Sequence, residues 1–579
     1  MCIVQMPLVK EPAASFFFVL KLLFMKTKFL LFCFLFTFCA NRNNANAQVN
    51  VQDSLALVDL YNSTNGVNWV NNTNWLTSNP VSTWYGIISV SNGRVIYINL
   101  ETNNLAGQLP SSIGNLQKLG TLRLPVNQLS GSIPSSIGNL VNLKRLNLYS
   151  NQLSGSIPSS IGNLANLQVL VLNGNQLNGA IPSSLGNLVN LQMLDLGSNH
   201  LSDTIPSSLG NLQNLTVLWL AYNQLRGSIP PSLGNLASLQ NLAVHLNQLT
   251  GSIPSSLGKL ANLRYLSLSF NQLSGSIPSS LGNLVNLFTL ELSNNQLSGS
   301  IPSSLGNLVI NLIGVYLSNN QLSGSIPSSL GNLVNLYYLY LNNNQLTGRI
   351  PSSLGNLERL GELHLNNNRL SGSIPSSLGN LNPSLSLSLN GNHFTFDGME
   401  LIAQTFPNAI YDKQKRIPIH QNGNTLSVSA GGTLSNNTYK WYRFRHAGDT
   451  IIIKGDSVFH PTQNGKYLVR VKNSVATKLT LYSDSIVYIA PAVIASAENS
   501  LQQYDKTNSF RVYPNPARDI LFVQTNSNAS FSLLNQSGKI LLTKNVNGKG
   551  SINISGMAGG LYYLRNNSSG AVQKVIISR

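Results

Sequence analysis

Few side chains in this chain have the types and the spacing that catalysis or metal binding requires. The sequence contains no GxGxxG, GxxxxGK[ST], HExxH, GxSxG or CxxC motif, the short patterns that mark phosphate-binding loops, zinc hydrolases, nucleophilic serines and paired thiols. The sequence therefore predicts no metal site and no cofactor. The histidines are scattered, and no two of them have the spacing of metal ligands: His200, His245, His364, His393, His420, His446 and His460.

Two pairs of ionisable residues remain as candidates for acid–base chemistry. Asp195 and Glu291 occupy the same position of a 24-residue repeat, four repeats apart. At the usual strand spacing their separation is roughly 19 Å, whereas paired glycosidase carboxylates lie roughly 5–9.5 Å apart. Glu362 and His364 share one strand face, where such a pair is more often a surface ion pair than a catalytic one. We therefore expect that the protein is not an enzyme.

Aromatic side chains at the variable positions of the repeat are better candidates for a function. The segment SGSIPSSLGNL hardly changes between repeats, whereas the residues between the strand leucines do. Exposed aromatic residues on a rigid scaffold are typical binding anchors, although Tyr and Trp also favour strands by propensity alone. The candidate ligand-binding residues are Tyr149, Trp219, Tyr222, Tyr265, Tyr316, Tyr338, Tyr340 and His364. We expect binding to be centred on the later repeats, where Tyr316 and Tyr340 lie roughly 5 Å apart.

Thirteen copies of one 24-residue pattern between residues 95 and 392 must position these side chains. In the copy at 143–166, Leu146 and Leu148 alternate with polar neighbours, which indicates a short strand with its leucines facing inward. Asn151 stands where the chain leaves that strand, and its amide can bond backbone groups above and below it in the stack. The predicted structural Asn ladder comprises Asn127, Asn151, Asn175, Asn199, Asn223, Asn247, Asn271, Asn295, Asn320, Asn344 and Asn368.

The pattern LxxLxLxxNxLxGxIPxxLGNLxN resembles the leucine-rich repeat, in the variant with Gly-x-Ile-Pro found in plant receptor-like proteins. The resemblance implies an α/β solenoid, a horseshoe with a parallel sheet whose variable strand residues face the concave surface. One repeat cannot bury its apolar face alone, so the stack needs caps. We assign the solenoid with its C-terminal cap to residues 95–410 and an N-terminal cap to residues 48–94. The three tryptophans of that cap either cover the open end of the core or bind a ligand: Trp69, Trp75 and Trp84.

The first 47 residues, 1–47, are typical of a secretory signal peptide. An apolar core at 29–40 follows a basic start, and the small-x-small sequence that ends at Ala47 predicts cleavage before Gln48. The cysteines all lie in this segment, so we expect no disulfide and no thiol chemistry in the mature chain: Cys2, Cys33 and Cys39. We expect no integral membrane span after the signal is removed, because no later stretch is apolar enough.

The remainder of the chain favours β-structure. Residues 411–490 contain short alternating strands, and Trp441 with the Gly-x-Tyr-x-Val sequence that ends at Val469 resembles an immunoglobulin-like β-sandwich, which places Trp441 in its core. Residues 491–509 are polar and rich in Ala and Ser, as in a linker. Residues 510–579 are predicted to form a small all-β unit and resemble the type IX secretion C-terminal sorting domain through VYPNPA, LNQSGK, MAGGLY and the final KVIISR. This resemblance implies a Bacteroidetes-type bacterium, passage through the outer membrane and the type IX secretion machinery as a partner.

The formal net charge of +18 is located mainly in this C-terminal part. Residues 48–403 contain eleven Lys/Arg and ten Asp/Glu, whereas residues 404–579 contain twenty and seven. Nucleic-acid affinity comes mainly from neutralised phosphates, so a nearly uncharged repeat array argues against nucleic acid as the partner. We interpret the basic tail as a solvated surface that keeps the protein soluble.

These observations together favour a secreted, cell-surface, non-enzymatic recognition or adhesion protein. Its concave face would hold an extracellular protein, a peptide or a glycan. The alternative is a structural or ice-binding solenoid that works through the regular Ser/Asn ladder of its convex face. The two hypotheses differ in the surface they use, because the first depends on the variable strand residues and the second on the repeated ones.

Overall fold

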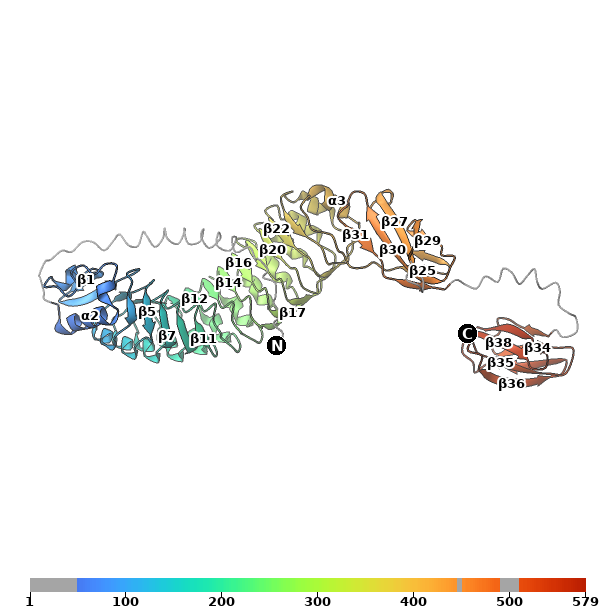
Figure 1. The fold of residues 1–579 in the computed structure, drawn as a ribbon, viewed down its shortest axis with the longest axis horizontal. Coiled ribbons are helices and arrows are strands. Elements are labelled where there is room, and N and C mark those ends of the chain that lie inside the picture. Colours follow the sequence, from blue (N-terminus) through green and yellow to red (C-terminus); the bar gives the residue numbers. More distant parts are fainter. Residues whose placement is uncertain (1–48, 445–449, 490–509, 579) are drawn as a thin grey trace. The chain divides into compact units, whose positions relative to one another are not determined.

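A computed structural model describes residues 49–444, 450–489 and 510–578 (Figure 1). The chain divides into two compact units, one reaching to residue 487 without residues 461–464, and one that contains residues 488–579 with residues 461–464. The predicted signal peptide, its cleavage site between Ala47 and Gln48, and the predicted linker at 491–509 lie outside the described residues. Within the described residues, no helix has the length and apolar character to cross a membrane.

The largest sheet of the described residues has fourteen strands, and it confirms the predicted solenoid. A typical strand has three residues, with one inward-facing leucine between two outward-facing residues. These leucines, such as Leu122, Leu146 and Leu170, are fully buried and lie in register on successive strands. All neighbours pair in parallel except β1 and β2. In sheet order the strands are β1 Ile87–Ser91, β2 Arg94–Asn99, β4 Thr121–Arg123, β6 Arg145–Asn147, β8 Val169–Val171, β10 Met193–Asp195, β12 Val217–Trp219, β13 Asn241–Ala243, β14 Tyr265–Ser267, β16 Thr289–Glu291, β18 Gly314–Tyr316, β20 Tyr338–Tyr340, β22 Glu362–His364 and β24 Ser386–Ser388.

In many of the repeats, the chain forms a second short strand after the ladder asparagine. These strands pair in parallel along the array and form smaller sheets beside the main one. They are β3 Ala106–Gln108, β5 Gln128–Gly131, β7 Gln152–Ser156, β9 Gln176–Ala180, β11 His200–Ser202, β15 Ser274–Ser276, β17 Gln296–Ser300, β19 Gln321–Ser323, β21 Thr347–Gly348 and β23 Arg369–Leu370.

The return path of each repeat is a five-residue 3-10 helix, not an α-helix. A proline precedes each helix in extended conformation and fixes the entry of the chain. The glycine within it is required by close packing, since a Cβ on Gly162 would lie 2.5 Å from the Ser184 carbonyl oxygen of the next repeat. The helices are η3 Ser111–Asn115, η4 Ser135–Asn139, η5 Ser159–Asn163, η6 Ser183–Asn187, η7 Ser207–Asn211, η8 Pro231–Asn235, η9 Ser255–Lys259, η10 Ser279–Asn283, η11 Ser303–Asn307, η12 Ser328–Asn332, η13 Ser352–Asn356 and η14 Ser376–Asn380.

The ladder asparagines bond their own repeat and the preceding one. Oδ1 of Asn223 accepts a hydrogen bond from the backbone N–H of Leu201 at 2.9 Å, and its Nδ2 donates to the carbonyl oxygens of Leu196 at 3.0 Å and Leu220 at 3.2 Å. The expectation that each amide bonds backbone groups both above and below it was therefore wrong, because these partners of the Asn223 side chain lie in its own repeat and in the preceding one. The following repeat is joined by its own asparagine, because Nδ2 of Asn247 donates back to Leu220.

Replacing one rung of this ladder should weaken the array locally. In Asn223→Ala the backbone N–H of Leu201 loses its acceptor inside the stack, which should cost about 1–3 kcal/mol of unfolding free energy. Because each repeat contacts only its neighbours, unfolding should also become less cooperative around this repeat. Chemical denaturation measures both effects, with Gln224→Ala, an exposed neighbour, as the control. A wild-type denaturation profile would show that solvent replaces the lost bond.

The N-terminal cap buries its aromatic residues against the first repeats. It contains α2 Val51–Ser63, η1 Gly66–Asn68 and η2 Val81–Thr83. Trp69, Trp75 and Trp84 are all buried, and the ring centroids of Trp75 lie 4.8 Å and 4.9 Å from those of Trp69 and Trp84. Asp53, fully buried in α2, pairs with Arg94 of β2 at 2.7 Å. Because these tryptophans are buried, they cover the core end and do not present a binding surface.

A second cap and a β-rich domain follow the last repeat. Helix α3 Met399–Thr405 covers the end of the array, and Glu400 in it accepts hydrogen bonds from Asn436 and Asn473 of the β-rich domain. Trp441 is fully buried and stacks on Phe459 with centroids 5.2 Å apart, as expected for the core of an immunoglobulin-like domain. Its elements are β25 His420–Asn422, β26 Thr425–Ser427, η15 Leu434–Asn436, β27 Asn437–Phe444, β28 Thr450–Gly455, β29 Val458–Phe459, β30 Gly465–Asn473, β31 Thr480–Tyr482 and β32 Ile486–Tyr488.

The C-terminal unit is all-β with a core of its own. Its described strands form one sheet in the order β33-β34-β37 and another in the order β36-β35-β38-β39. Alternating residues of these strands, including Phe531, Leu533, Leu564 and Val575, are fully buried between them. The strands are β33 Arg511–Tyr513, β34 Ile520–Gln524, β35 Ala529–Leu534, β36 Ile540–Val546, β37 Lys549–Asn553, β38 Gly560–Asn566 and β39 Val572–Ile577.

Candidate functional site

The fold aligns the predicted binding residues in columns on the outer face of the main sheet. In the second half of the array, Glu291, Tyr316, Tyr340 and His364 are paired in register on the successive strands β16, β18, β20 and β22. The leucine or valine before each of them is buried beneath the sheet, so the side chains of this column point away from the core. Their position is thus set by the repeat, while their chemistry is free to vary.

Three tyrosines on β18 and β20 converge into one group, here called the tyrosine cluster: Tyr316, Tyr338 and Tyr340. The ring centroids of Tyr316 lie 5.1 Å from Tyr340 and 5.9 Å from Tyr338, and those of Tyr338 and Tyr340 lie 6.3 Å apart. The imidazole of His364 stacks on Tyr340 at 4.5 Å. The cluster therefore offers several aromatic faces and edges within the width of two strands.

A partly buried carboxylate borders the cluster on its N-terminal side. Glu291 accepts hydrogen bonds from the Ser267 hydroxyl at 2.6 Å and the Tyr265 hydroxyl at 3.0 Å. Burial raises the pKa of Glu291, and the two hydroxyls counteract this by stabilising its charged form. Tyr265, on β14, acts here through its hydroxyl on the carboxylate and is part of the same network.

A second carboxylate borders the cluster on its C-terminal side. Glu362 accepts a hydrogen bond from the Tyr340 hydroxyl and lies 3.4 Å from Nε2 of His364, a contact that is an ion pair only when the imidazole is protonated. The contact with His364 lowers the pKa of Glu362, opposed by burial and assisted by Tyr340. Glu362 and His364 thus do touch, as their shared strand face allows, and they belong to the tyrosine network instead of standing alone on the surface.

Two glycines and a fourth tyrosine that the sequence reasoning missed complete this surface. A Cβ on Gly314 would lie 2.6 Å from the ring of Tyr316, and a Cβ on Gly361 would lie 2.2 Å from the ring of Tyr337. Tyr337 is 45% exposed and packs edge-on against Tyr338 at 4.6 Å. The available signal was glycine at the first position of β18 and directly before β22, where most other repeats carry larger side chains.

Tyr222 and Tyr149 do not lie with the strand residues. Tyr222 follows β12 in a left-handed turn with φ of 57°, is 53% exposed, and packs its ring edge-on against His245 at 5.4 Å. Tyr149 follows β6 and lies several strands from the tyrosine cluster. Tyr222 thus occupies the turn itself, whereas Tyr149 precedes the corresponding turn residue of its repeat, Ser150, which has φ of 55°.

The turn residues reveal a further feature that the sequence reasoning missed. Leu246 and Phe270 occupy the position equivalent to Tyr222 in the next two repeats, also with positive φ, where most other copies have Ser, Gly or Asn. Bulky residues are uncommon in this conformation. Nearby, the Trp219 Nε1 and His245 Nδ1 atoms are buried without a hydrogen-bond partner, and burial lowers the pKa of His245 to about 4.

The first carboxylate of the column is isolated from the second. Asp195 is buried, accepts a hydrogen bond from the Gly197 backbone N–H at 3.0 Å, and has its pKa raised to about 6 by burial. Three strands, β12, β13 and β14, separate it from Glu291, so the two carboxylates cannot act on one bond. In the described part of the chain, no group of three His, Cys, Asp or Glu residues is arranged to hold a metal ion.

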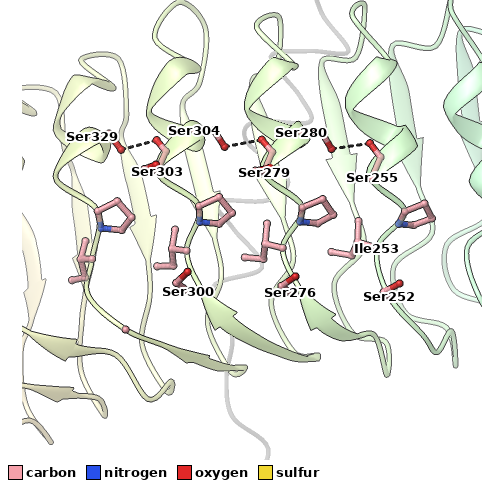
Figure 2. A pocket seen from close by; sticks show the side chains of 18 of the residues that line it. Ser252, Ile253, Ser255, Ser276, Ser279, Ser280, Ser300, Ser303, Ser304 and Ser329 are labelled. Carbon is pink, nitrogen blue, oxygen red and sulfur yellow. Dashed lines mark hydrogen bonds between the residues drawn. The ribbon is translucent and has the colours of Figure 1, made fainter.

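The convex side has a regular arrangement of serines, and one serine hydroxyl in each repeat is hydrogen-bonded to the backbone of the preceding repeat. The Ser280 hydroxyl donates to the Ser255 carbonyl oxygen at 2.7 Å, and the same bond recurs from Ser304 to Ser279 (Figure 2). A shallow groove lined by the Ser-Ile-Pro-Ser-Ser segments runs along these helices. The bonded hydroxyls link neighbouring repeats, so one serine in each copy has a structural role.

Comparison with known proteins identifies two parts of the chain. Sequence profiles described as a leucine-rich repeat region match residues 172–272 and 245–392, and a leucine-rich repeat profile matches residues 142–201. A profile described as a secretion system C-terminal sorting domain matches residues 511–578. No curated protein sequence matches the chain.

Several solved structures share the repeat fold. The crystal structure of PEPR1–AtPEP1 is 34% identical, with a TM-score of 0.53, over 63% of this chain and 58% of that chain. The ectodomain of the receptor kinase GASSHO1/SCHENGEN3 from Arabidopsis thaliana, in complex with CASPARIAN STRIP INTEGRITY FACTOR 2, is 33% identical over 62% and 52%, with a TM-score of 0.48. A plant ice-binding protein is 26% identical over 60% and 95%, with a TM-score of 0.38. The chain thus spans little more than half the length of the first two relatives.

Proposed function

Because the chain belongs to the leucine-rich repeat proteins and ends in a secretion system C-terminal sorting domain, we propose that it is a non-enzymatic recognition or adhesion protein of the cell surface. Its ligand is an extracellular peptide, protein or glycan that binds the concave face of the repeat array. The similarity to PEPR1–AtPEP1 at 34% identity supports a recognition role for the array. The sorting domain implies export and supports the type IX secretion machinery as a second partner.

The observation that carries this proposal is the tyrosine cluster on the later half of the sheet. Tyr316, Tyr338 and Tyr340 are partly exposed, lie within contact of one another and are fixed by a rigid parallel sheet. Aromatic rings held in this way supply a large contact area at little entropic cost on binding. Such a surface can stack on a sugar ring or hold an apolar or cationic side chain.

The convex alternative has weaker support. An ice-binding or structural face would use the repeated serines, yet one hydroxyl in each repeat already donates to the preceding repeat, as Ser280 does to Ser255. The residues that differ between repeats lie on the sheet face and its adjoining turns. A regular lattice is matched by residues that repeat, whereas side chains that differ from one repeat to the next can discriminate one ligand from another.

The test is to screen the full chain on peptide and glycan arrays and then to block one face at a time. Gly314→Thr should crowd Tyr316 from its place, while the backbone accepts the new side chain because Thr289 occupies the equivalent position of the preceding strand. For the peptide or glycan found in this screen, here called the screened ligand, we expect about a tenfold loss of affinity, or ~1.4 kcal/mol. The melting temperature should be unchanged.

Ser325→Thr is the matched control on the other side of the repeat. Ser325 is exposed, and Thr204 occupies the equivalent position of an earlier repeat, so this change should leave both binding and stability as they are. Loss of binding in Ser325→Thr with retention in Gly314→Thr would refute the concave site and favour the convex face.

A further inference from the structure

The charges of the repeat array are separated by face. The strands of the main sheet from β8 to β24 contain Asp195, Glu291 and Glu362 but neither Lys nor Arg. The turn residues that join each of these strands to its ladder asparagine also contain no Lys or Arg. The basic residues of the same repeats all lie elsewhere in the repeat: Arg226, Lys259, Arg264, Arg349, Arg359 and Arg369. Arg264 directly precedes β14, at the position that Tyr337 has before β20. From β16 to β24, the main-sheet strands, the residues before them and the turns after them contain Glu291 and Glu362 but no Lys or Arg.

The two carboxylates beside the tyrosine cluster are held in place without being neutralised by Lys or Arg. Neutral hydroxyls of Tyr265 and Ser267 hold Glu291, and Tyr340 with His364 holds Glu362. Near the N-terminal end of the array the arrangement differs, since Glu101 pairs with Arg123 at 2.6 Å. Contacts with hydroxyl groups, and with an imidazole that is not protonated, leave most of the negative charge available to a ligand, whereas pairing with arginine does not.

Both carboxylates act on the same aromatic group. Glu291 is the register partner of Tyr316 on the neighbouring strand. Glu362 accepts a hydrogen bond from Tyr340, whose ring centroid lies 5.1 Å from that of Tyr316. In keeping with this, the pKa of Tyr316 is raised chiefly by burial and further by the charges of Glu291 and Glu362. The negative face of an aromatic ring attracts a cation, and the attraction grows where water is partly excluded. Rings and carboxylates here therefore favour the same kind of ligand group.

We infer that the tyrosine cluster, together with Glu291 and Glu362, binds the guanidinium group of an arginine in a peptide or protein ligand. A planar guanidinium stacks on tyrosine rings and donates hydrogen bonds to carboxylates at its edge, which an ammonium group does less well. This inference rests on the proposed function, because it assigns a ligand class to the concave site.

The first experiment measures how the full wild-type chain binds two peptides that have the same shape but differ in charge. The probes are a short peptide of alternating Gly and Arg and the same peptide with citrulline, which keeps the planar side chain but lacks its charge. Isothermal titration should show about tenfold tighter binding of the arginine peptide, with an intermediate affinity for the lysine version. Equal affinity for the arginine and citrulline peptides would overturn the inference without any variant that must fold.

The second experiment locates the charge that the arginine meets. Glu291→Gln and Glu362→Gln keep the shape and the hydrogen-bonding oxygen, and each should reduce binding of the arginine peptide about tenfold while leaving the citrulline peptide unaffected. Glu101→Gln, in the turn after β2 at the other end of the array, is the control away from the cluster and should change nothing. An equal loss in all three variants would mean general electrostatic attraction and would overturn the assigned site.

Failure of this inference can be told apart from failure of the proposed function. If Gly314→Thr weakens binding of the screened ligand but the chain binds the arginine and citrulline peptides equally, the concave site stands and only the arginine assignment is refuted. If Gly314→Thr leaves binding of the screened ligand unchanged and the chain also shows no preference for the arginine peptide, both the concave site and the arginine assignment are refuted.

Discussion

Deleting residues 510–579 should abolish surface display while leaving the repeat array folded. The reason lies in the independence of the two units: the described sorting region has its own core, which includes Phe531 and Leu564, in a separate compact unit. The array keeps its core and both caps when that unit is removed. A truncated chain with an intact signal peptide should therefore accumulate in the periplasm, because the sorting domain addresses it to the outer membrane.

Protease treatment of intact cells, followed by fractionation, measures this outcome. The truncated chain should be protected from the external protease, and its array should melt as in the full chain. Fusing residues 510–579 to an unrelated exported protein is the complementary control and should bring that protein to the surface. Normal display of the truncated chain would show that the tail is not the address.

Removing two rings of the tyrosine cluster should remove most of the binding without unfolding the array. Tyr316 and Tyr340 lie on the outer face of the sheet, over the buried residues Val315 and Leu339, and their centroids are 5.1 Å apart. The double variant Tyr316→Ala, Tyr340→Ala should lose about 2 kcal/mol or more of binding free energy for the screened ligand, the usual size for a central aromatic anchor. Its melting temperature should stay within a few degrees of wild type.

The measurement pairs titration of the screened ligand with a thermal melt of the same sample. Tyr482→Ala, an exposed tyrosine of the β-rich domain, is the matched control and should bind as wild type. Unchanged affinity of the double variant would move the site to the turn residues Tyr222, Leu246 and Phe270 or to the β-rich domain. The buried cap tryptophans no longer compete for that role. Loss of folding in the double variant would mean that these rings contribute to the core.

Much of the fold was predictable because each repeat specifies its own place. Leu122, Leu146 and Leu170 recur every 24 residues and lie in register on neighbouring strands, since a stacked unit that repeats in sequence must repeat in space. The same reasoning predicted the buried Trp441 of the β-rich domain and the column shared by Glu291, Tyr316 and Tyr340. It did not locate the turns, where Tyr222 lies with positive φ.

The sequence by itself thus determined the stack, its register and the columns of outward-facing residues, because period and polarity decide which side of a strand a residue occupies. The tertiary structure decided which of those residues meet. The contacts of Glu291 with Tyr265 and of Tyr340 with Glu362 join different repeats and depend on how each ring tilts. That tilt depends in turn on the volume left empty beside it, as at Gly314, and a pattern of residue types along the chain does not contain this information.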